Sequence, residues 1–386
     1  MKVIHVIPGL SVRGGGGDRA CAELAESQAN LGHDVTIIHL ENNGNLSLKL
    51  KGVEVVVCQR DKTIWGRFFD KSEGFKNEFV KRVKETDIVH IHALWRYINV
   101  DAAKICKKYK KPYVVQPHGL LEPWRLRYKR FRKLIWGCLF EKKVLSCAVS
   151  IHAESEKDRK YIQRYLPKSN VFVVPCGIYA EEFLKKTIYN HLADKWSVPN
   201  NKKVIAYLGR IDVHKGLDLL LKSFSQLKEL HEDYHLLIIG PDYANTKKRL
   251  ETLSRLLHIE KFITWVEMIS EMEEKRLLFQ KSHFFVLPSY SENFGITVLE
   301  ALFSKCPVIT TTETAWGDLV KYNAGIIVEP NVKSLSEGIK KMVSMSFEER
   351  KQMVESGFKY VNGKYDWLSI ASATVQEYKK IVSDQN

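Results

Sequence analysis

With 386 residues, 45% of them hydrophobic, the chain is too long for one typical core, and we expect two domains of roughly 150–200 residues each. No apolar stretch approaches the roughly 18 residues that span a bilayer, and the opening Met1–Pro8 is too short for a signal peptide. Seven scattered cysteines without a Cys-x-x-Cys pair argue against a disulfide framework or a zinc knuckle. We expect a cytoplasmic protein with reduced thiols.

The formal net charge is +15, and the excess of basic residues lies in the N-terminal half. Within residues 124–136, cations alternate with aromatic and aliphatic residues at spacings that a helix sorts into two faces. This pattern is typical of binding to an anionic membrane surface, but it also fits a solvated helix whose Trp and Leu residues face the core. No helix-turn-helix, RNP or finger pattern accompanies the charge, so we expect no nucleic-acid partner. The predicted membrane-facing cations are Arg127, Lys129, Arg130, Arg132 and Lys133.

In chain order, strand-like apolar runs alternate with amphipathic segments, from Val3–Ile7 in the first half to Gly325–Val328 in the second. Repeated β-then-α order predicts parallel sheets with helices on both faces, and therefore an α/β protein of two Rossmann-like domains. We expect the domains to cover residues 1–185 and 186–365, with a last amphipathic helix over 366–386. The first is expected to bind the acceptor and the second the donor, as argued below.

Two motifs in the second half follow strand-like runs. Arg210 and Lys215 lie in the loop after Val204–Leu208, and ligands of open α/β sheets bind at such carboxyl strand ends. An Arg fork beside a Lys charge suits a diphosphate. After Phe284–Pro288, Glu292 and Glu300 flank a glycine that can open a helix, whose N-terminus binds phosphate while carboxylates accept sugar hydroxyls. The alternative is that these two acids are an ordinary turn residue and an exposed or first-turn helix acid.

Two further features lie in the first half. Gly14–Gly17 follow the first strand and precede a helix that begins near Asp18, so backbone can approach a ligand there, although a glycine run is equally typical of a flexible loop. The run lacks the full dinucleotide fingerprint. His118 follows the strand Tyr113–Gln116, where an imidazole could bond a sugar hydroxyl or phosphate; a loop histidine without such a role is the alternative.

These segments together resemble a known family. The pair "GRIDVHKG" and "PSYSENFGITVLEAL" is similar to the C-terminal half of retaining GT-B glycosyltransferases of family 4, in the group 1 glycosyl transferases. The glycine-rich "PGLSVRGGGGDRACAELAESQANLGHDV" resembles the family's opening, and "PHGLLEPWRLR" resembles a central motif of its polysaccharide-building members. The resemblance covers nearly the whole chain and is weakest over residues 42–84. It implies a GT-B fold, with two Rossmann-like domains across a cleft and a C-terminal helix that crosses back onto the first.

The resemblance also assigns roles. Arg210 and Lys215 would hold the donor diphosphate and stabilise the departing nucleoside diphosphate, while Glu300 would bind the ribose. Glu292 would contact the transferred sugar or stabilise positive charge near its anomeric carbon. The predicted catalytic residues are thus His118, Arg210, Lys215 and Glu292. The predicted donor-binding residues are Gly15, Gly16, Gly209, Arg210, Lys215, Met268, Glu292, Asn293, Phe294, Gly295, Ile296 and Glu300.

We expect no metal and no cofactor other than the nucleoside-diphosphate sugar, which is a co-substrate. His90 and His92 alternate on one face of the strand Asp87–Ala93, but neither a carboxylate nor a cysteine stands beside them at ligand spacing. The chain also contains no Asp-x-Asp, the usual metal signature of the other large glycosyltransferase fold. Two departures from the family are Glu267 where relatives often have glycine near the base pocket, and Cys176 in place of an asparagine.

The sequence therefore predicts a retaining, metal-independent glycosyltransferase. It would move a sugar to a glycan acceptor, expected to be lipid-linked, in cell-surface polysaccharide or lipopolysaccharide O-antigen synthesis. The basic stretch would hold it peripherally on the inner face of the plasma membrane. Two alternatives stay open from the sequence: a nucleotide-sugar epimerase of the same fold, and a non-catalytic scaffold at the membrane surface.

Overall fold

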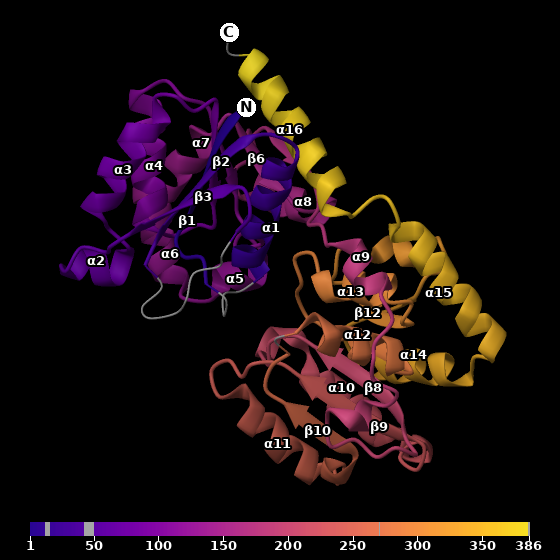
Figure 1. Cartoon of the computed structure of the whole chain (residues 1–386). Coiled ribbons are helices and arrows are strands. Elements are labelled where there is room, and N and C mark those ends of the chain that lie inside the picture. Colours follow the sequence, from indigo (N-terminus) through magenta and orange to yellow (C-terminus); the bar gives the residue numbers. More distant parts are fainter. Residues whose placement is uncertain (12–15, 42–49, 270, 385–386) are drawn as a thin grey trace. The chain divides into compact units, whose positions relative to one another are not determined.

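The computed structural model describes residues 1–11, 16–41, 50–269 and 271–384, and Figure 1 traces the chain. The chain divides into two compact units. The first unit combines Met1–Gly177 with Tyr365–Asn386, and the second unit consists of Ile178–Lys364. Each unit is built on a parallel β-sheet with helices, so the predicted α/β class with two Rossmann-like domains is confirmed.

In its described residues, the first unit has a seven-stranded parallel sheet of order β3-β2-β1-β4-β5-β6-β7. From β1 the chain adds β2 and β3 on one side of the sheet, and from β4 it adds β5, β6 and β7 on the other side. In doubly wound sheets, ligands bind in a crevice at the carboxyl ends of the two strands between which the winding reverses. The strands are β1 (Lys2–Ile7), β2 (Asp34–Leu40), β3 (Val53–Cys58), β4 (Ile88–His92), β5 (Tyr113–Gln116), β6 (Ser150–Ala153) and β7 (Val171–Val173).

The two faces of this sheet differ in chemistry, because successive side chains of a strand point to opposite faces. Ile4 and Val6 of β1 belong to the hydrophobic core that includes Phe75 and Phe79 of α3. His5, between them, belongs to the other face and bonds a residue of α1. The helical segments of the unit are α1 (Gly16–Asn30), α2 (Ile64–Phe69), α3 (Glu73–Val83), α4 (Tyr97–Lys108), α5 (Pro123–Arg127), α6 (Arg130–Trp136), η1 (Gly137–Glu141), α7 (Lys142–Ser146), α8 (Glu156–Tyr165) and α16 (Trp367–Ser383).

The last helix, α16, packs beside α1 in the first unit (Figure 1). The Asp366 carboxylate caps its N-terminus by accepting from the amide of Leu368. The indole N–H of Trp367 donates to Glu23 of α1 at 2.7 Å. The predicted return of the C-terminal helix to the first domain is confirmed.

In its described residues, the second unit has a six-stranded parallel sheet of order β10-β9-β8-β11-β12-β13. The winding direction reverses between β8 and β11, and ligands of such sheets bind at the carboxyl ends of the strands where this happens. The strands are β8 (Lys203–Leu208), β9 (Tyr234–Ile239), β10 (Ile263–Val266), β11 (Phe284–Leu287), β12 (Val308–Thr311) and β13 (Ile326–Val328). The helical segments are α9 (Ala180–Leu184), η2 (Leu192–Asp194), η3 (Val213–Lys215), α10 (Leu217–Gln226), η4 (Lys228–Leu230), α11 (Thr246–Leu256), η5 (Glu260–Phe262), α12 (Met272–Lys281), α13 (Ile296–Phe303), η6 (Gly317–Leu319), α14 (Val332–Ser344) and α15 (Phe347–Val361).

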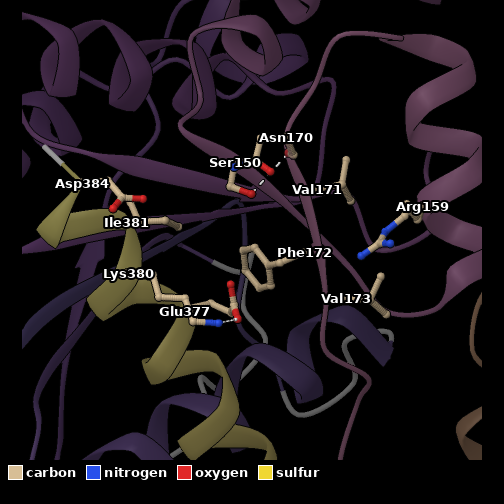
Figure 2. Close-up of a pocket in the computed structure, with 10 residues that line it drawn as sticks. All are labelled: Ser150, Arg159, Asn170, Val171, Phe172, Val173, Glu377, Lys380, Ile381 and Asp384. Carbon is tan, nitrogen blue, oxygen red and sulfur yellow. Dashed lines mark hydrogen bonds and ion pairs between the residues drawn. The ribbon is translucent and has the colours of Figure 1, made fainter.

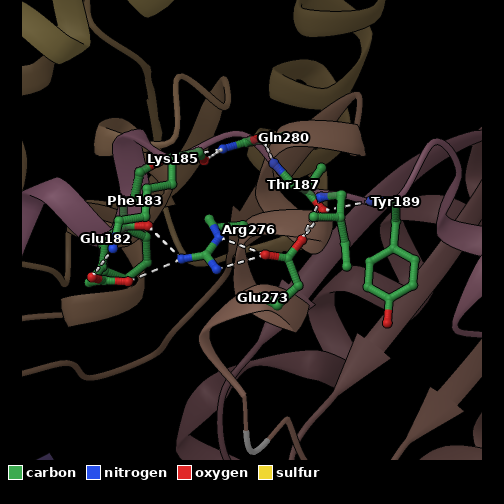
Figure 3. Close-up of polar contacts among 9 residues, drawn as sticks. Glu182, Phe183, Lys185, Thr187, Tyr189, Glu273, Arg276 and Gln280 are labelled. Atoms are coloured by element: carbon green, nitrogen blue, oxygen red, sulfur yellow. Dashed lines mark hydrogen bonds and ion pairs between the residues drawn. The ribbon is translucent and has the colours of Figure 1, made fainter.

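The start of the second unit is tied to α12 by polar contacts (Figure 3). The guanidinium of Arg276 donates to the carbonyl of Glu182 at 2.9 Å and also pairs with Glu273 at 2.7 Å. Glu273 accepts in turn from the Thr187 hydroxyl at 2.5 Å. These contacts explain why the segment from Ile178 onward belongs to the second unit, although the sequence placed the domain boundary at residues 185 and 186.

None of the described helices combines the length and the apolar character that crossing a membrane requires. A hollow of about 440 Å³ runs along the edge strand β7 between α8 and α16 (Figure 2). It is lined by residues such as Phe172, Arg159 and Lys380, and by none of the predicted site residues.

Candidate functional site

The loops after β8 and β11 are held against each other in the second unit. Gly216 has a φ of +68°, and a Cβ at this position would lie 2.0 Å from the carbonyl oxygen of Pro288. Only glycine allows the backbones to approach this closely. The amide of Tyr290 also donates to the carbonyl of His214 at 2.8 Å. The two predicted motif loops therefore meet at the carboxyl ends of β8 and β11.

Lys215 and Glu292 form an ion pair across these loops. Both side chains are only 12% exposed, so the pair is shielded from water and is not an incidental surface contact. Glu292 is also fixed by its amide, which donates to the carbonyl of Glu313 at 3.2 Å. The cationic loop and the acidic loop that the sequence singled out therefore meet through this ion pair, while the role of Glu292 in donor binding stays a prediction.

The start of α13 is held rigidly. Gly295 precedes the helix with a φ of +78°, and its carbonyl accepts from the indole N–H of Trp316 at 3.2 Å. The ring of the buried Phe294 packs on Trp316, with centroids 5.1 Å apart. The first amides of the helix therefore point from a fixed position, as an anion site requires.

Glu300 lies within α13 and is 2% exposed, so the reading of it as an exposed or first-turn acid is wrong. Its Oε1 pairs with Lys275 of α12, whose side chain is 15% exposed. Its Oε2 is buried without a hydrogen-bond partner. Sequence reasoning missed Lys275, although it stands one helical turn before the buried Phe279 and hence on the inner face of α12.

Arg210 is placed differently from Lys215. Its guanidinium lies over the ring of Tyr243, 5.5 Å from the centroid, and its carbonyl accepts from the Tyr207 hydroxyl at 2.8 Å. Gly209 precedes Arg210, and its carbonyl oxygen lies close to Gly240. A Cβ added to Gly240 would lie 1.8 Å from that oxygen. The aromatic ring fixes one face of the guanidinium.

In the first unit, the glycine-rich loop and His118 adjoin. Gly15 lies outside the described residues, and Gly16 is the first residue of α1. A Cβ on Gly17 would lie 3.4 Å from the His118 ring. His118, at a φ of +51°, follows β5. Gly17 and His118 thus adjoin on the carboxyl side of the sheet.

Both ring nitrogens of His118 already have partners. Nε2 lies 3.0 Å from Nδ1 of His92, and Nδ1 lies 2.7 Å from Oε1 of Glu154. The direct bond from this imidazole to a sugar hydroxyl or phosphate, predicted from the sequence, is therefore not free to form in this geometry. Glu154, which follows β6, was not foreseen because it comes from a different strand.

Comparisons with known proteins match both units of the chain. Residues 190–360 match the family described as Glycosyl transferases group 1, and residues 14–182 match Glycosyltransferase Family 4. An uncharacterized glycosyltransferase of Methanocaldococcus jannaschii is 26% identical over 97% of this chain and 95% of its own. The GDP-mannose:cellobiosyl-diphosphopolyprenol alpha-mannosyltransferase of Komagataeibacter xylinus is 23% identical over 99% of this chain and 94% of its own. The structure of Anabaena HepE in complex with UDP and glucose superposes with a TM-score of 0.78 at 14% identity, over 98% of this chain and 100% of that one.

The chain is a glycosyltransferase with the GT-B fold. Its two family matches divide between the two units, and each carries one of the loop sets described above. The epimerase and scaffold alternatives gain no support from these matches.

The other residues predicted to bind the donor lie in different parts of the second unit. Asn293 and Ile296 are half-buried beside Glu292 and at the start of α13. Met268 follows the edge strand β10 and is 46% exposed. The neighbouring Glu267 is also exposed. The structure gives no contact that joins Met268 to the Lys215–Glu292 pair, and its role stays a prediction.

The basic stretch of the glycosyltransferase exposes its apolar side chains as well as its cations. Phe131 is 81% exposed, and Leu134, Ile135 and Leu139 are also well exposed. Leu126 and Trp136 are half-buried and pack against the core, as the other reading expected of the Trp and Leu residues. Four of the five predicted cations are exposed as expected: Arg127, Lys129, Arg130 and Arg132.

Lys133 differs from these four cations. It is half-buried, donates to the carbonyl of Arg125 and lies over the ring of Trp95. Burial, together with the nearby Arg125 and Lys129 charges, lowers the pKa of its amine. Its assignment as a membrane-facing cation is therefore the weakest of the five.

Three buried residues of the glycosyltransferase, His5, Cys21 and His92, form the one group in its described part that could hold a metal ion. The nearest nitrogens of His5 and His92 are 2.9 Å apart. Two nitrogens on one tetrahedral zinc would be about 3.3 Å apart, given bond lengths near 2.0–2.1 Å. The observed separation is that of a hydrogen bond. Cys21 was not foreseen beside His92 because it comes from α1.

Proposed function

We propose that this protein is a retaining glycosyltransferase that moves a sugar from a nucleoside-diphosphate sugar to a hydroxyl of a lipid-linked glycan, without a metal ion. The product would enter cell-surface polysaccharide or lipopolysaccharide O-antigen. The observation that carries the proposal is the convergence of Lys215 and Glu292 at the carboxyl ends of β8 and β11.

The donor diphosphate would be held by cations and by the start of a helix. Lys215 is kept in place by Glu292 until an anionic ligand arrives, and a diphosphate can then share its ammonium. Arg210 lies in the same loop, and the amides at the start of α13 add favourable dipoles. The buried Oε2 of Glu300 has an open acceptor position for a ribose hydroxyl.

The reaction would break the bond between the anomeric carbon and the β-phosphate oxygen, and the electron pair would pass to that oxygen. The acceptor hydroxyl would form the new bond on the same face of the sugar and give its proton to the departing phosphate. Lys215 and Arg210 would stabilise the negative charge that develops on the leaving group, the task a metal ion performs elsewhere. Glu292 would stabilise positive charge on the sugar.

Two observations support a lipid-linked acceptor. The name of the Komagataeibacter xylinus relative specifies a diphosphopolyprenol-linked acceptor. The second observation is the exposed stretch from Trp124 to Leu139, where apolar side chains and cations share one surface. Apolar groups that enter the headgroup region, together with cations beside anionic lipids, suit the cytoplasmic face of a membrane.

A thermal-shift panel of nucleoside diphosphates and nucleotide sugars, with and without EDTA, tests the donor site. Any ligand that binds only the folded protein raises the melting temperature. We expect one nucleotide family to stabilise the protein, EDTA to leave the shift unchanged, and Glu300→Gln to abolish it. No shift with any member would refute the donor site, and a shift lost in EDTA would refute metal independence. A radiolabelled-sugar transfer assay with a polyprenol-diphosphate glycan then tests the acceptor class.

A further inference from the structure

Two arginines share one buried carboxylate in the first unit. Arg60 donates from Nε to one oxygen of Asp70 at 2.9 Å, and Arg96 donates from Nη1 to the other oxygen at 2.8 Å. Asp70 is 5% exposed. Two guanidinium groups share a single carboxylate, so one positive charge is left that Asp70 does not neutralise. These three residues are called the arginine cluster below.

The arginine cluster joins segments that follow different strands. Arg60 comes two residues after the end of β3, and Arg96 comes four residues after the end of β4. Because β2 and β1 lie between these strands, their carboxyl ends are about 14 Å apart, at roughly 4.8 Å per strand. The long arginine side chains and Asp70 close this distance. The cluster therefore forms after the carboxyl ends of the strands, the side on which ligands of such sheets bind.

The two arginines differ in how fully they are used. Arg60 is 21% exposed and also donates to the carbonyl of Glu41, so Arg60 alone can neutralise Asp70 and hold it in place. Arg96 is 50% exposed, and within the part of the chain that the structure describes its guanidinium pairs with Asp70 only, through Nη1. A guanidinium offers five N–H donors. Arg96 is thus fixed by one of them, while its other donors and its charge are available to a ligand.

An aromatic contact places the cluster beside the basic stretch. Phe69, which precedes Asp70, stacks on Trp136 of α6, with centroids 5.4 Å apart and planes 8° apart. Tyr97, which follows Arg96, meets the same indole edge-on at 6.4 Å. One side chain of the stretch from Trp124 to Leu139 therefore contacts the chain neighbours of both Asp70 and Arg96.

Exposed apolar side chains accompany both partners of this contact. Phe68 of α2, two residues before Asp70, is 67% exposed, and Phe131, in the same helix as Trp136, is 81% exposed. When a protein lies on a membrane, such side chains enter the boundary between headgroups and acyl chains. The phosphates of lipids lie just outside that boundary. An arginine fixed near these residues therefore suits the depth at which lipid phosphates are found.

The chemistry of a lipid-linked acceptor fits this position. Its phosphate groups lie between the lipid and the glycan, at the surface of the membrane. An arginine fork binds two phosphate oxygens at once, and such charge-assisted hydrogen bonds are roughly twice as strong as neutral ones. A diphosphate bound by Arg96 would hold the glycan next to the first unit while the lipid stays in the membrane.

We propose that Arg96, oriented by Asp70, binds the diphosphate that links polyprenol to glycan in the acceptor, and that Phe68 of α2 enters the membrane together with the basic stretch. This assignment rests on the proposed function, because it names a contact for the lipid-linked acceptor. Arg60 holds Asp70 in place, and neither arginine takes part in breaking or forming a bond.

Sedimentation with vesicles of two compositions tests the assignment without donor or sugar transfer. One set is phosphatidylcholine with a polyprenyl diphosphate, and the other is phosphatidylcholine with phosphatidylglycerol at the same surface charge. We expect the wild type to bind the first set about tenfold more tightly, the scale of one hydrogen bond between charged groups. Arg96→Gln should abolish this preference.

Four further variants separate the contributions. Arg132→Gln, an exposed cation of the basic stretch, should weaken binding to both sets and keep the preference. Arg96→Lys keeps the charge but loses the fork, so it should retain only part of the preference. Phe68→Ser should weaken binding to both sets equally. Lys215→Ala should keep the preference, which excludes the proposed donor site as its source.

Equal binding of the wild type to the two sets, or a preference that Arg96→Gln retains, would overturn the proposal. Unchanged binding of Phe68→Ser would remove Phe68 from the membrane surface. Melting temperatures check that each variant folds, and if Arg96→Gln does not, the wild type and Arg96→Lys still decide the outcome. A preference for the diphosphate without sugar transfer would refute the proposed function and leave the Arg96 site standing, whereas transfer without the preference would refute the Arg96 site alone.

Discussion

Lys275 and Glu300 form an ion pair inside the second unit that uses only one oxygen of the carboxylate. Lys275 therefore both neutralises Glu300 and fixes the orientation of its carboxylate. The pair joins α12 to α13, so α12 adds a residue to the predicted donor site.

Lys275→Met should destabilise the protein by about 3–5 kcal/mol, because it leaves Glu300 charged and buried without its partner. Chemical denaturation of the apoprotein measures this. The double variant Lys275→Met with Glu300→Gln should regain part of the loss, since the buried charge is gone. Lys281→Met, at the exposed end of the same helix, is the matched control. Equal stability of Lys275→Met and Lys281→Met would contradict the prediction.

Lys215→Ala should lower kcat/KM by about 10²–10³-fold, the scale of a removed charge-stabilising donor. The initial rate of sugar transfer, at saturating and at low donor concentrations, measures the effect. Lys222→Ala removes a partly exposed lysine of α10 in the same unit and should retain wild-type rates. Wild-type turnover by Lys215→Ala would show that Lys215 does not stabilise the leaving group.

Gly216→Ala should be more destabilising than an alanine at another positive-φ glycine. A left-handed backbone alone costs an alanine about 1 kcal/mol, and Gly216 adds a clash with the Pro288 carbonyl. Gly363→Ala measures the cost of the left-handed backbone alone, since φ there is +76° and no atom lies within 4 Å of the added Cβ. Denaturant midpoints of the two variants give the difference. Equal losses would show that the two loops can separate freely.

Acid should unfold the protein through its buried histidines. Burial lowers the pKa of His5, His152, His235 and His283 to about 4. The unfolded chain takes up these protons near pH 6.5, so stability is complete above pH 6.5 and falls as the pH drops toward 4. Each histidine contributes up to about 1.4 kcal/mol per pH unit.

Two buried carboxyls oppose this trend. Burial raises the pKa of Asp158 to about 8 and that of Glu141 to about 7, so each stays protonated in the folded state while the unfolded chain loses its proton. Their contribution to the free energy of unfolding falls with rising pH. Because the buried histidines are more numerous, their opposite effect is larger. The melting temperature should therefore rise from pH 4.5 to 6.5, less steeply in His152→Phe. A flat melting temperature over this range would contradict the buried neutral histidines.

The exposed apolar residues should matter more for membrane binding than the cations at high salt. The fourfold change of Phe131, Leu134, Ile135 and Leu139 to Ser should abolish sedimentation with anionic vesicles at every salt concentration. The change of Arg127, Lys129, Arg130 and Arg132 to Gln should weaken binding mainly at low salt, since each cation contributes about 1 kcal/mol near an anionic leaflet. Leu256→Ser with Phe347→Ser, exposed in the second unit, is the control. Unchanged binding in both sets would refute the membrane surface.

The sequence predicts features that depend on the order of elements. Strand runs followed by loops place Lys215 and Glu292 at carboxyl strand ends, and neighbouring strands of a parallel sheet bring such ends together. It does not predict contacts that depend on how a helix is rotated about its axis. Lys275 reaches Glu300, and Cys21 reaches the vicinity of His92, only because α12 and α1 turn these residues inward.

His118 shows a second limit of prediction. Its place after β5 is readable from the sequence, but the identity of its partners depends on β4 and β6, which are separate in the chain. The alternation within β4 indicates that His90 and His92 share a face. It does not show that His5 and His152 join them, since the pairing of strands is set by the whole sheet.

The return of α16 to the first unit affects how the protein is made. Trp367 meets Glu23 across 344 residues of chain, so the ribosome must synthesise the whole second unit before this helix can pack beside α1. The second unit is continuous in sequence and can fold while the first still exposes the apolar flank of α1. During that interval the nascent first unit is the part most open to chaperones and to aggregation, and a truncation that removes α16 would make this state permanent.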